Sequence, residues 1–129
     1  MVDSKITELD SDWTVVLFCH SYFITYSVLP YEIPNQNKEI AQHFGNLKCN
    51  ATIACLITGH SHIDESDSEN GMLVICTTCD NHTLLVDSSI TRTKGTDTEQ
   101  AFDYVQIDTA NRKIYCTRIG AGNDREFSY

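Results

Sequence analysis

Three histidines stand where imidazole groups could bind a metal ion. His60 and His62 lie on either side of Ser61, directly after Gly59, and His20 follows an apolar run much earlier in the chain. Neutral imidazole is the commonest nitrogen ligand of divalent transition metals. Two imidazoles at positions i and i+2 of an extended turn can project to the same side, and the glycine lets the backbone turn tightly. His20, His60 and His62 are therefore the candidate metal ligands.

Two apolar segments would position these histidines. Residues 13–19 and 52–58 are nearly continuous apolar runs, which is the pattern of strands buried on both faces in the centre of a layered α/β protein. Functional groups in such proteins gather beyond the carboxyl ends of the central strands. If the two strands are parallel neighbours, all three imidazoles share one rim of the sheet.

The rest of the pattern predicts a mixed α/β fold with one main helix. Apolar periodicity favours a helix over residues 36–48. Strands are predicted over residues 72–77 and 83–86, and a C-terminal β-hairpin over 102–108 and 113–119. Polar stretches without these patterns are expected to form a lead-in or loops: 1–12, 64–70 and 88–100.

Composition excludes several classes of protein. The 129 residues carry a net charge of −9, which disfavours a basic face for gripping a phosphate backbone. The apolar runs are far shorter than the roughly 20 residues of a membrane-spanning helix, and the polar N-terminus does not resemble a signal peptide. We therefore expect no membrane association and a cytoplasmic location, in which the six cysteines are reduced thiols.

Other potential sites have weaker support. Cys76, Cys79 and His82 have the spacing of part of a zinc site, but no fourth ligand is identified. Redox chemistry is not favoured either, because no predicted helix follows Cys76 to lower the pKa of its thiol. Gly120–Gly122 is interpreted as a turn in preference to an anion-binding nest. The acidic cluster lacks the spacing of a calcium loop, so a solvated loop is favoured: Asp64, Glu65, Asp67 and Glu69. Asp64 remains a candidate for a carboxylate that orients the His62 imidazole by a hydrogen bond without binding the metal itself.

The sequence resembles one family of metal enzymes. Residues 15–20 (VVLFCH) and 56–62 (LITGHSH) look like the last two metal-binding motifs of the calcineurin-like metallophosphoesterases, and residues 108–129 are similar to the C-terminal hairpin and tail of bacterial and phage members. The similarity covers most of residues 13–129. It implies part of a four-layer αββα sandwich with a binuclear site of manganese, iron or zinc. His20 and His60 would bind the second metal and His62 the first.

The chain departs from the family pattern before His20. The complete site also needs an Asp-x-His motif, a bridging Asp after a glycine, and a Gly-Asn-His-Asp/Glu motif, and the residues before His20 contain no histidine. The resemblance therefore implies that 1–129 is a single partial domain, the C-terminal half of a phosphoesterase. In it, 13–62 supply the ligand strands and 63–129 the other strands and the hairpin. No catalytic residue is identified, since the histidine that protonates the leaving group is missing.

The functional hypothesis is a metal-dependent phosphoric ester hydrolase segment that is inactive without its N-terminal half or an equivalent partner subunit. The complete enzyme would hold two divalent ions, and this chain alone at most one. Phosphate esters are the implied substrates, and nucleic acid stays among them. The alternative hypothesis is a non-catalytic metal-binding or protein-interaction module in which the same histidines bind one ion or none.

Overall fold

A computed structural model describes residues 1–21, 36–60, 62–68, 71–80 and 90–129. Sheet A has the strand order β1-β2-β4-β3, and sheet B has the order β5-β6-β7. Sheet A consists of β1 (Thr14–Ser21), β2 (Thr52–Gly59), β4 (Val74–Cys76) and β3 (Glu65–Asp67). Sheet B consists of β5 (Ala101–Asp108), β6 (Lys113–Gly120) and β7 (Arg125–Ser128). The helices are α1 (Val2–Thr7) and α2 (Gln36–Gly45).

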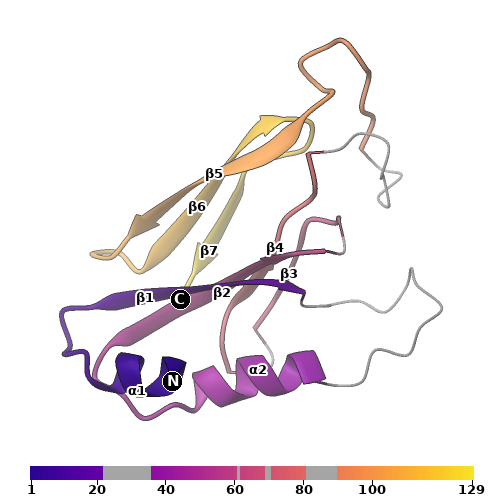
Figure 1. Ribbon diagram of the computed structural model, residues 1–129. Coiled ribbons are helices and arrows are strands. Elements are labelled where there is room, and N and C mark those ends of the chain that lie inside the picture. Colours follow the sequence, from indigo (N-terminus) through magenta and orange to yellow (C-terminus); the bar gives the residue numbers. More distant parts are fainter. Residues whose placement is uncertain (22–35, 61, 69–70, 81–89) are drawn as a thin grey trace.

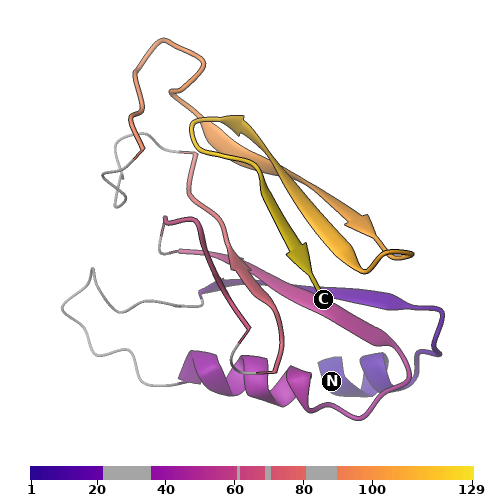
Figure 2. The same ribbon diagram turned by 180° about the vertical axis from the view of Figure 1, so that it is seen from behind.

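The described elements stack in three layers, with α1 and α2 on one face of sheet A and sheet B on the other (Figures 1 and 2). One apolar cluster joins the two sheets and includes Cys55, Ile75 and Ile114. A second cluster joins sheet A to α2 through Leu56 and Ala41. Sheet A buries side chains on both faces because β2 and β4 contribute to both clusters. The chain is thus α/β with a mixed sheet, as the sequence predicts.

The predicted strand–helix–strand unit is present. β1 and β2 pair in parallel, from Thr14 opposite Thr52 to Ser21 opposite Gly59, with α2 between them along the chain. A register shift after Val15 leaves Ala54 without a partner on β1, which is the pattern of a β-bulge. Because the strands run in the same direction, their carboxyl ends meet at one rim of sheet A.

The prediction that the first strand is buried on both faces is wrong. β1 stands at the end of the strand order, and among the described residues it pairs with β2 alone. None of residues 14–20 is buried, and Phe18 is 74% exposed, whereas Ala54 to Thr58 of β2 are all buried. An apolar run indicates a strand, but the number of neighbouring strands determines its burial.

Two polar segments that were expected to lack regular structure form short elements. Residues 2–7 of the expected lead-in form α1, which buries Ile6. Residues 65–67 of the expected acidic loop form β3, antiparallel to β4. Backbone hydrogen bonds to β4 stabilise β3, and they do not depend on side-chain polarity. The predicted main helix is present as α2, which ends at Gly45, before the predicted end at residue 48, and α1 is an additional short helix.

The C-terminal hairpin is confirmed and extended. β5 pairs with β6 from Ala101 opposite Gly120 to Asp108 opposite Lys113. β7 adds a third strand to β6, in a tail for which the sequence predicted no strand. A positive φ of 95° at Gly120 allows its backbone to approach Gln100, whose carbonyl oxygen would lie 1.9 Å from an added Cβ. The predicted strand over 83–86 lies outside the described residues.

Candidate metal centre

His20 and His60 meet at the shared rim of β1 and β2. His20 lies near the end of β1, and His60 directly follows β2. Nε2 of His20 and Nδ1 of His60 are 3.1 Å apart, and the rings lie edge to face with centroids 5.0 Å apart. His20 is exposed and His60 is half-buried. The parallel pairing of the two strands thus brings two of the three candidate ligands into contact.

This spacing of ring nitrogens permits two kinds of chemistry. Without an ion, one ring donates its N–H to the lone pair of the other, and the tautomers set the direction. With metal–nitrogen bonds of about 2.1 Å, a separation of 3.1 Å between the two nitrogens corresponds to an N–metal–N angle of about 95°. That angle lies between octahedral and tetrahedral values. The distance between the nitrogens is therefore compatible with two neighbouring positions around a divalent ion, which would require the lone pairs of both rings to point at that ion.

His62 is not grouped with this pair. It is half-buried, and its backbone carbonyl accepts a hydrogen bond of 3.0 Å from Thr78 Oγ1. Within the described ranges, no group of three or more His, Cys, Asp or Glu side chains is placed to hold a metal ion. Further ligands for an ion at His20 and His60 would come from other residues, water or a partner chain.

The turn that carries His60 and His62 has an unusual backbone. Both residues have positive φ, 70° at His60 and 60° at His62. This left-handed region is costly for residues other than glycine, and it persists where the surroundings hold the chain in place. The segment after β4 provides one such restraint, since the N–H of Thr77 donates to the carbonyl of Thr58 at 3.0 Å.

Asp64 makes its described contacts with residues other than His62. Its Oδ1 accepts a hydrogen bond from the Thr78 N–H at 3.0 Å. Nη2 of Arg118 donates to Oδ1 at 2.8 Å and to Oδ2 at 2.7 Å, and Nη2 of Arg125 lies 3.2 Å from Oδ1. The carboxylate that the sequence assigned to the imidazole therefore joins the histidine turn to sheet B.

Asp103 completes a buried cluster of two arginines and two aspartates. Its carboxylate accepts from Arg118 Nε at 2.9 Å and from Arg125 Nη2 at 2.5 Å. The side chains of Asp103 and Arg118 are each only 2% exposed. Sequence reasoning missed this cluster, although the hairpin alternation places Asp103 on the same face as Val105. The register of the hairpin could have indicated the ion pair, because it places Asp103 directly opposite Arg118.

Two ionisable groups near the histidines have shifted pKa values. Burial opposes the charge on Arg118, but hydrogen bonds to Asp64 and Asp103 and their negative charges outweigh it and raise the Arg118 pKa. Burial also raises the pKa of the Cys19 thiol, next to His20, and a hydrogen bond with Thr58 only partly offsets this. The protonated thiol is therefore the favoured form of Cys19 in the metal-free chain.

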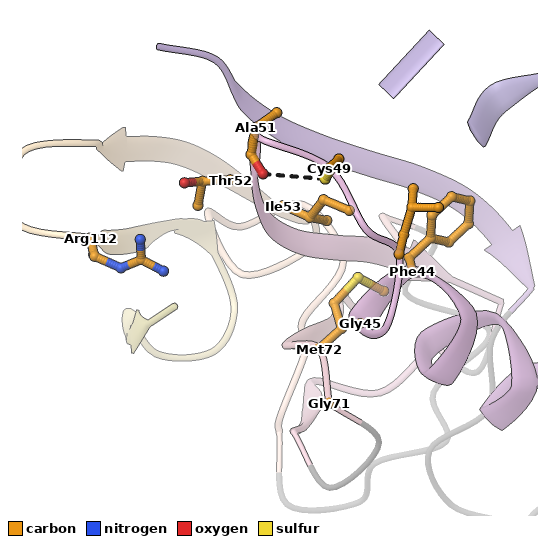
Figure 3. A pocket seen from close by; sticks show the side chains of 10 residues that line it. Phe44, Gly45, Cys49, Ala51, Thr52, Ile53, Gly71, Met72 and Arg112 are labelled. Atoms are coloured by element: carbon orange, nitrogen blue, oxygen red, sulfur yellow. Dashed lines mark hydrogen bonds between the residues drawn. The ribbon is translucent and has the colours of Figure 1, made fainter. Parts of the chain in front are cut away.

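Figure 3 shows a cavity among the described residues, and neither His20 nor His60 lines it. Its volume is about 260 Å³. It opens beside Thr52 and Ile53, at the start of β2, while His60 follows the opposite end of the same strand. Phe44, Met72 and the side chain of Arg112 also line it.

The competing motifs form no site in the described residues. Cys76 is buried and donates to the carbonyl of Gly59 at 3.4 Å, and His82 lies outside the described residues. All six cysteines are free thiols. Gly120–Gly122 forms the turn between β6 and β7, in agreement with the sequence.

Comparisons with protein families, with curated proteins and with solved structures give no match. Among the helices of the described residues, none is long and apolar enough to cross a membrane.

Proposed function

We propose that the chain is the C-terminal segment of a metal-dependent phosphoric ester hydrolase of the calcineurin-like type. In this proposal His20 and His60 bind one divalent ion, and His62 is a ligand of a second. The proposal is supported above all by the contact of 3.1 Å between His20 and His60. These residues are far apart in the chain, and two neighbouring parallel strands bring them together, as the resemblance implies.

The arrangement of layers gives further support. A mixed sheet with helices on one face and a second sheet on the other corresponds to three layers of the implied four-layer αββα sandwich (Figure 1). The outer face of sheet B exposes large side chains, among them Phe102 (49%), Tyr104 (58%) and Ile119 (40%). A fourth layer would cover these side chains in the complete domain.

The chemistry of the proposed site follows from its donors. Two divalent ions about 4 Å apart would polarise a phosphoryl group and lower the pKa of a water between them. The imidazoles of His20 and His60 hold and orient an ion without adding negative charge, so a phosphate ester is not repelled by them. Phosphate esters are therefore the substrate class, with monoesters, diesters and nucleic acids all included, and a cytoplasmic location suits the free thiols.

The proposed enzyme needs a further segment that carries the Asp-x-His, bridging Asp and Gly-Asn-His motifs, which residues 1–19 of this sequence do not contain. β1 offers a place for it. The strand is partly exposed, carries the exposed apolar side chain of Phe18, and has β2 as its pairing partner among the described residues. An additional strand along β1 would end at the same rim as His20 and could deliver carboxylate ligands there.

The same exposed strand favours a second candidate function, a non-catalytic protein-interaction or metal-binding module. In such a module the exposed Phe18 of β1 and the exposed Trp13, directly before the strand, would contact a partner. His20 and His60 would bind one ion or remain hydrogen-bonded to each other.

Metal titration with and without the missing segment separates the two functions. We expect the isolated chain to bind at most one Mn²⁺ or Zn²⁺ in calorimetry and to leave p-nitrophenyl phosphate and bis-p-nitrophenyl phosphate unhydrolysed. His20→Ala and His60→Ala should each weaken binding by ~10-fold or more, because a ligand is lost. His43→Ala is the matched control, since His43 lies on α2 and pairs with Asp3.

Co-expression with a segment that carries the three missing motifs should produce manganese-dependent hydrolysis that His60→Ala abolishes. Rapid hydrolysis by the isolated chain would contradict the proposed incompleteness of the site. A reconstituted complex that binds metal without hydrolysing either ester would favour the module.

A further inference from the structure

The Arg118–Asp64 ion pair connects the turn that carries His60 and His62 to sheet B. Asp64 is only two residues beyond His62, in the short connection between β2 and β3. Arg118 lies on β6 of the other sheet. Their contact therefore fixes the far end of the turn to a part of the molecule that is distant in sequence.

The described contacts restrain this turn at both ends. At its start, the Thr77 N–H bonds to the Thr58 carbonyl. At its end, Thr78 Oγ1 donates to the carbonyl of His62, and the Thr78 N–H donates to Asp64. Arg118 Nη2 then contacts both oxygens of the Asp64 carboxylate at 2.8 and 2.7 Å. We refer to Asp64, Thr78 and Arg118 as the turn clamp.

The turn needs such restraint because of its backbone. Residues other than glycine rarely keep positive φ unless neighbouring groups determine it, and His60 and His62 both do so. If the turn relaxed to the usual negative φ, the direction of the His60 side chain relative to β2 would change. Its Nδ1 would then no longer face His20.

Sheet B holds Arg118 firmly in place. The guanidinium also donates through Nε to Asp103 and through Nη1 to the carbonyl of Ala121, both at 2.9 Å. Gly122 passes so close that an added Cβ would lie 2.7 Å from Arg118 Nη1. With its side chain only 2% exposed, Arg118 has little freedom to follow a moving turn.

We propose that the Arg118–Asp64 pair is a positioning device: sheet B, through the turn clamp, holds the histidine turn in the conformation that sets His60 against His20. Arg118 and Asp64 touch no reacting group in this role and act through the backbone of the turn. The positioning itself does not depend on the proposed function, but its value for metal binding rests on that function.

The test is the contact between the two imidazole rings in the metal-free chain. We expect a nuclear Overhauser effect between ring protons of His20 and His60 in the wild type. The charge-balanced variant Asp64→Asn/Arg118→Met should lose it while the amide signals of both sheets persist. Arg125 and Asp103 remain paired in this variant, so no net buried charge is created.

A matched control removes a different ion pair that also involves β6. Lys113 on β6 pairs with Glu126 on β7 at the surface, away from the histidine turn. Lys113→Met/Glu126→Gln should keep the wild-type ring contact. A folded Asp64→Asn/Arg118→Met variant that also keeps it would overturn the proposal.

A milder variant decides the question if the double variant does not fold. Thr78→Val removes the hydroxyl that donates to His62 and retains the N–H that donates to Asp64. We expect a ring Overhauser effect clearly weaker than in the wild type, and an unchanged intensity would contradict the role of the clamp.

Manganese separates this inference from the proposed function. Mn²⁺ should broaden the His20 and His60 ring signals of the wild type, and the midpoint should shift to ~10-fold higher metal concentration in Asp64→Asn/Arg118→Met. Absence of broadening in the wild type would count against the proposed function alone, since the ring contact still tests the positioning. Equal midpoints in the two proteins would refute a role of the clamp in metal binding.

Discussion

The thiol of Cys55 is buried in the apolar cluster between the two sheets, and its protonation depends on that burial. Cys55 on β2 is fully buried between the two sheets, close to Cys116 on β6. Burial, with a smaller contribution from Cys116, raises the pKa of the Cys55 thiol to about 12. The protonated thiol is thus favoured in the folded chain, and Cys55 is an inert core residue.

The raised pKa of Cys55 predicts an alkaline loss of stability. A group with a higher pKa in the folded state contributes fully below its unfolded pKa, here near 9, and loses that contribution as the pH rises towards 12. The free energy of unfolding should therefore fall between pH 9 and pH 11, and Cys55→Ala should make this fall shallower. Urea unfolding at several pH values measures both slopes, and equal slopes would refute the prediction.

The residues that could be predicted from sequence were those with a local signal. His20 and His60 each follow an apolar run, and Gly59 marks the turn, so their shared rim follows once the strands are parallel. The Asp103–Arg118 pair has no local signal, because its partners meet only through the register of the hairpin. The buried charge cluster was therefore missed, and so were the contacts of Asp64 with Arg118 and Arg125.

Among the elements, β1 and β2 have similar sequences and different surroundings. Both are eight-residue strands rich in apolar side chains, yet Leu56 on β2 is 2% exposed and Phe18 on β1 is 74% exposed. Local pattern predicts where a strand forms. It does not predict how many strands flank it, because that depends on contacts with distant segments.

This difference predicts opposite tolerance to substitution in the two strands. Leu56→Ala should lower the free energy of unfolding by ~2–5 kcal/mol, because it leaves a cavity between sheet A and α2. Phe18→Lys should change it by less than about 1 kcal/mol, because the ring is already in contact with solvent. Chemical denaturation compares the two variants. A large loss from Phe18→Lys would show that β1 is covered in solution.

For the molecule as a whole, the buried charge cluster is the polar link between the layers. Arg118 and Arg125 on sheet B contact Asp64 on the sheet A side, and Arg125 Nη1 also donates to the carbonyl of Cys76 on β4 at 2.9 Å. Buried ion pairs contribute modest net stability, but removal of one partner leaves an uncompensated charge. The relative placement of the sheets therefore depends on all four side chains together.

We predict that Asp103→Asn destabilises the whole molecule. Both arginines lose a charged acceptor in a buried position, which should cost ~3–5 kcal/mol of unfolding free energy. The exposed pair Lys113 and Glu126 is the comparison, and Lys113→Met/Glu126→Gln should cost less than ~1 kcal/mol. Urea denaturation followed by circular dichroism measures both. Similar losses in the two variants would contradict the structural role of the cluster.

The arrangement of the two sheets also sets an order of assembly during synthesis. Sheet B is a meander whose strands follow one another through short turns, so its contacts close quickly. β1 and β2 are joined by a long connection, and closing it costs more chain entropy. The residues of sheet A are nevertheless synthesised first. The face of sheet A around Ile57 and Ile75 is covered only when the strands of sheet B have been synthesised. The nascent chain therefore exposes this apolar face until β5, β6 and β7 have left the exit tunnel.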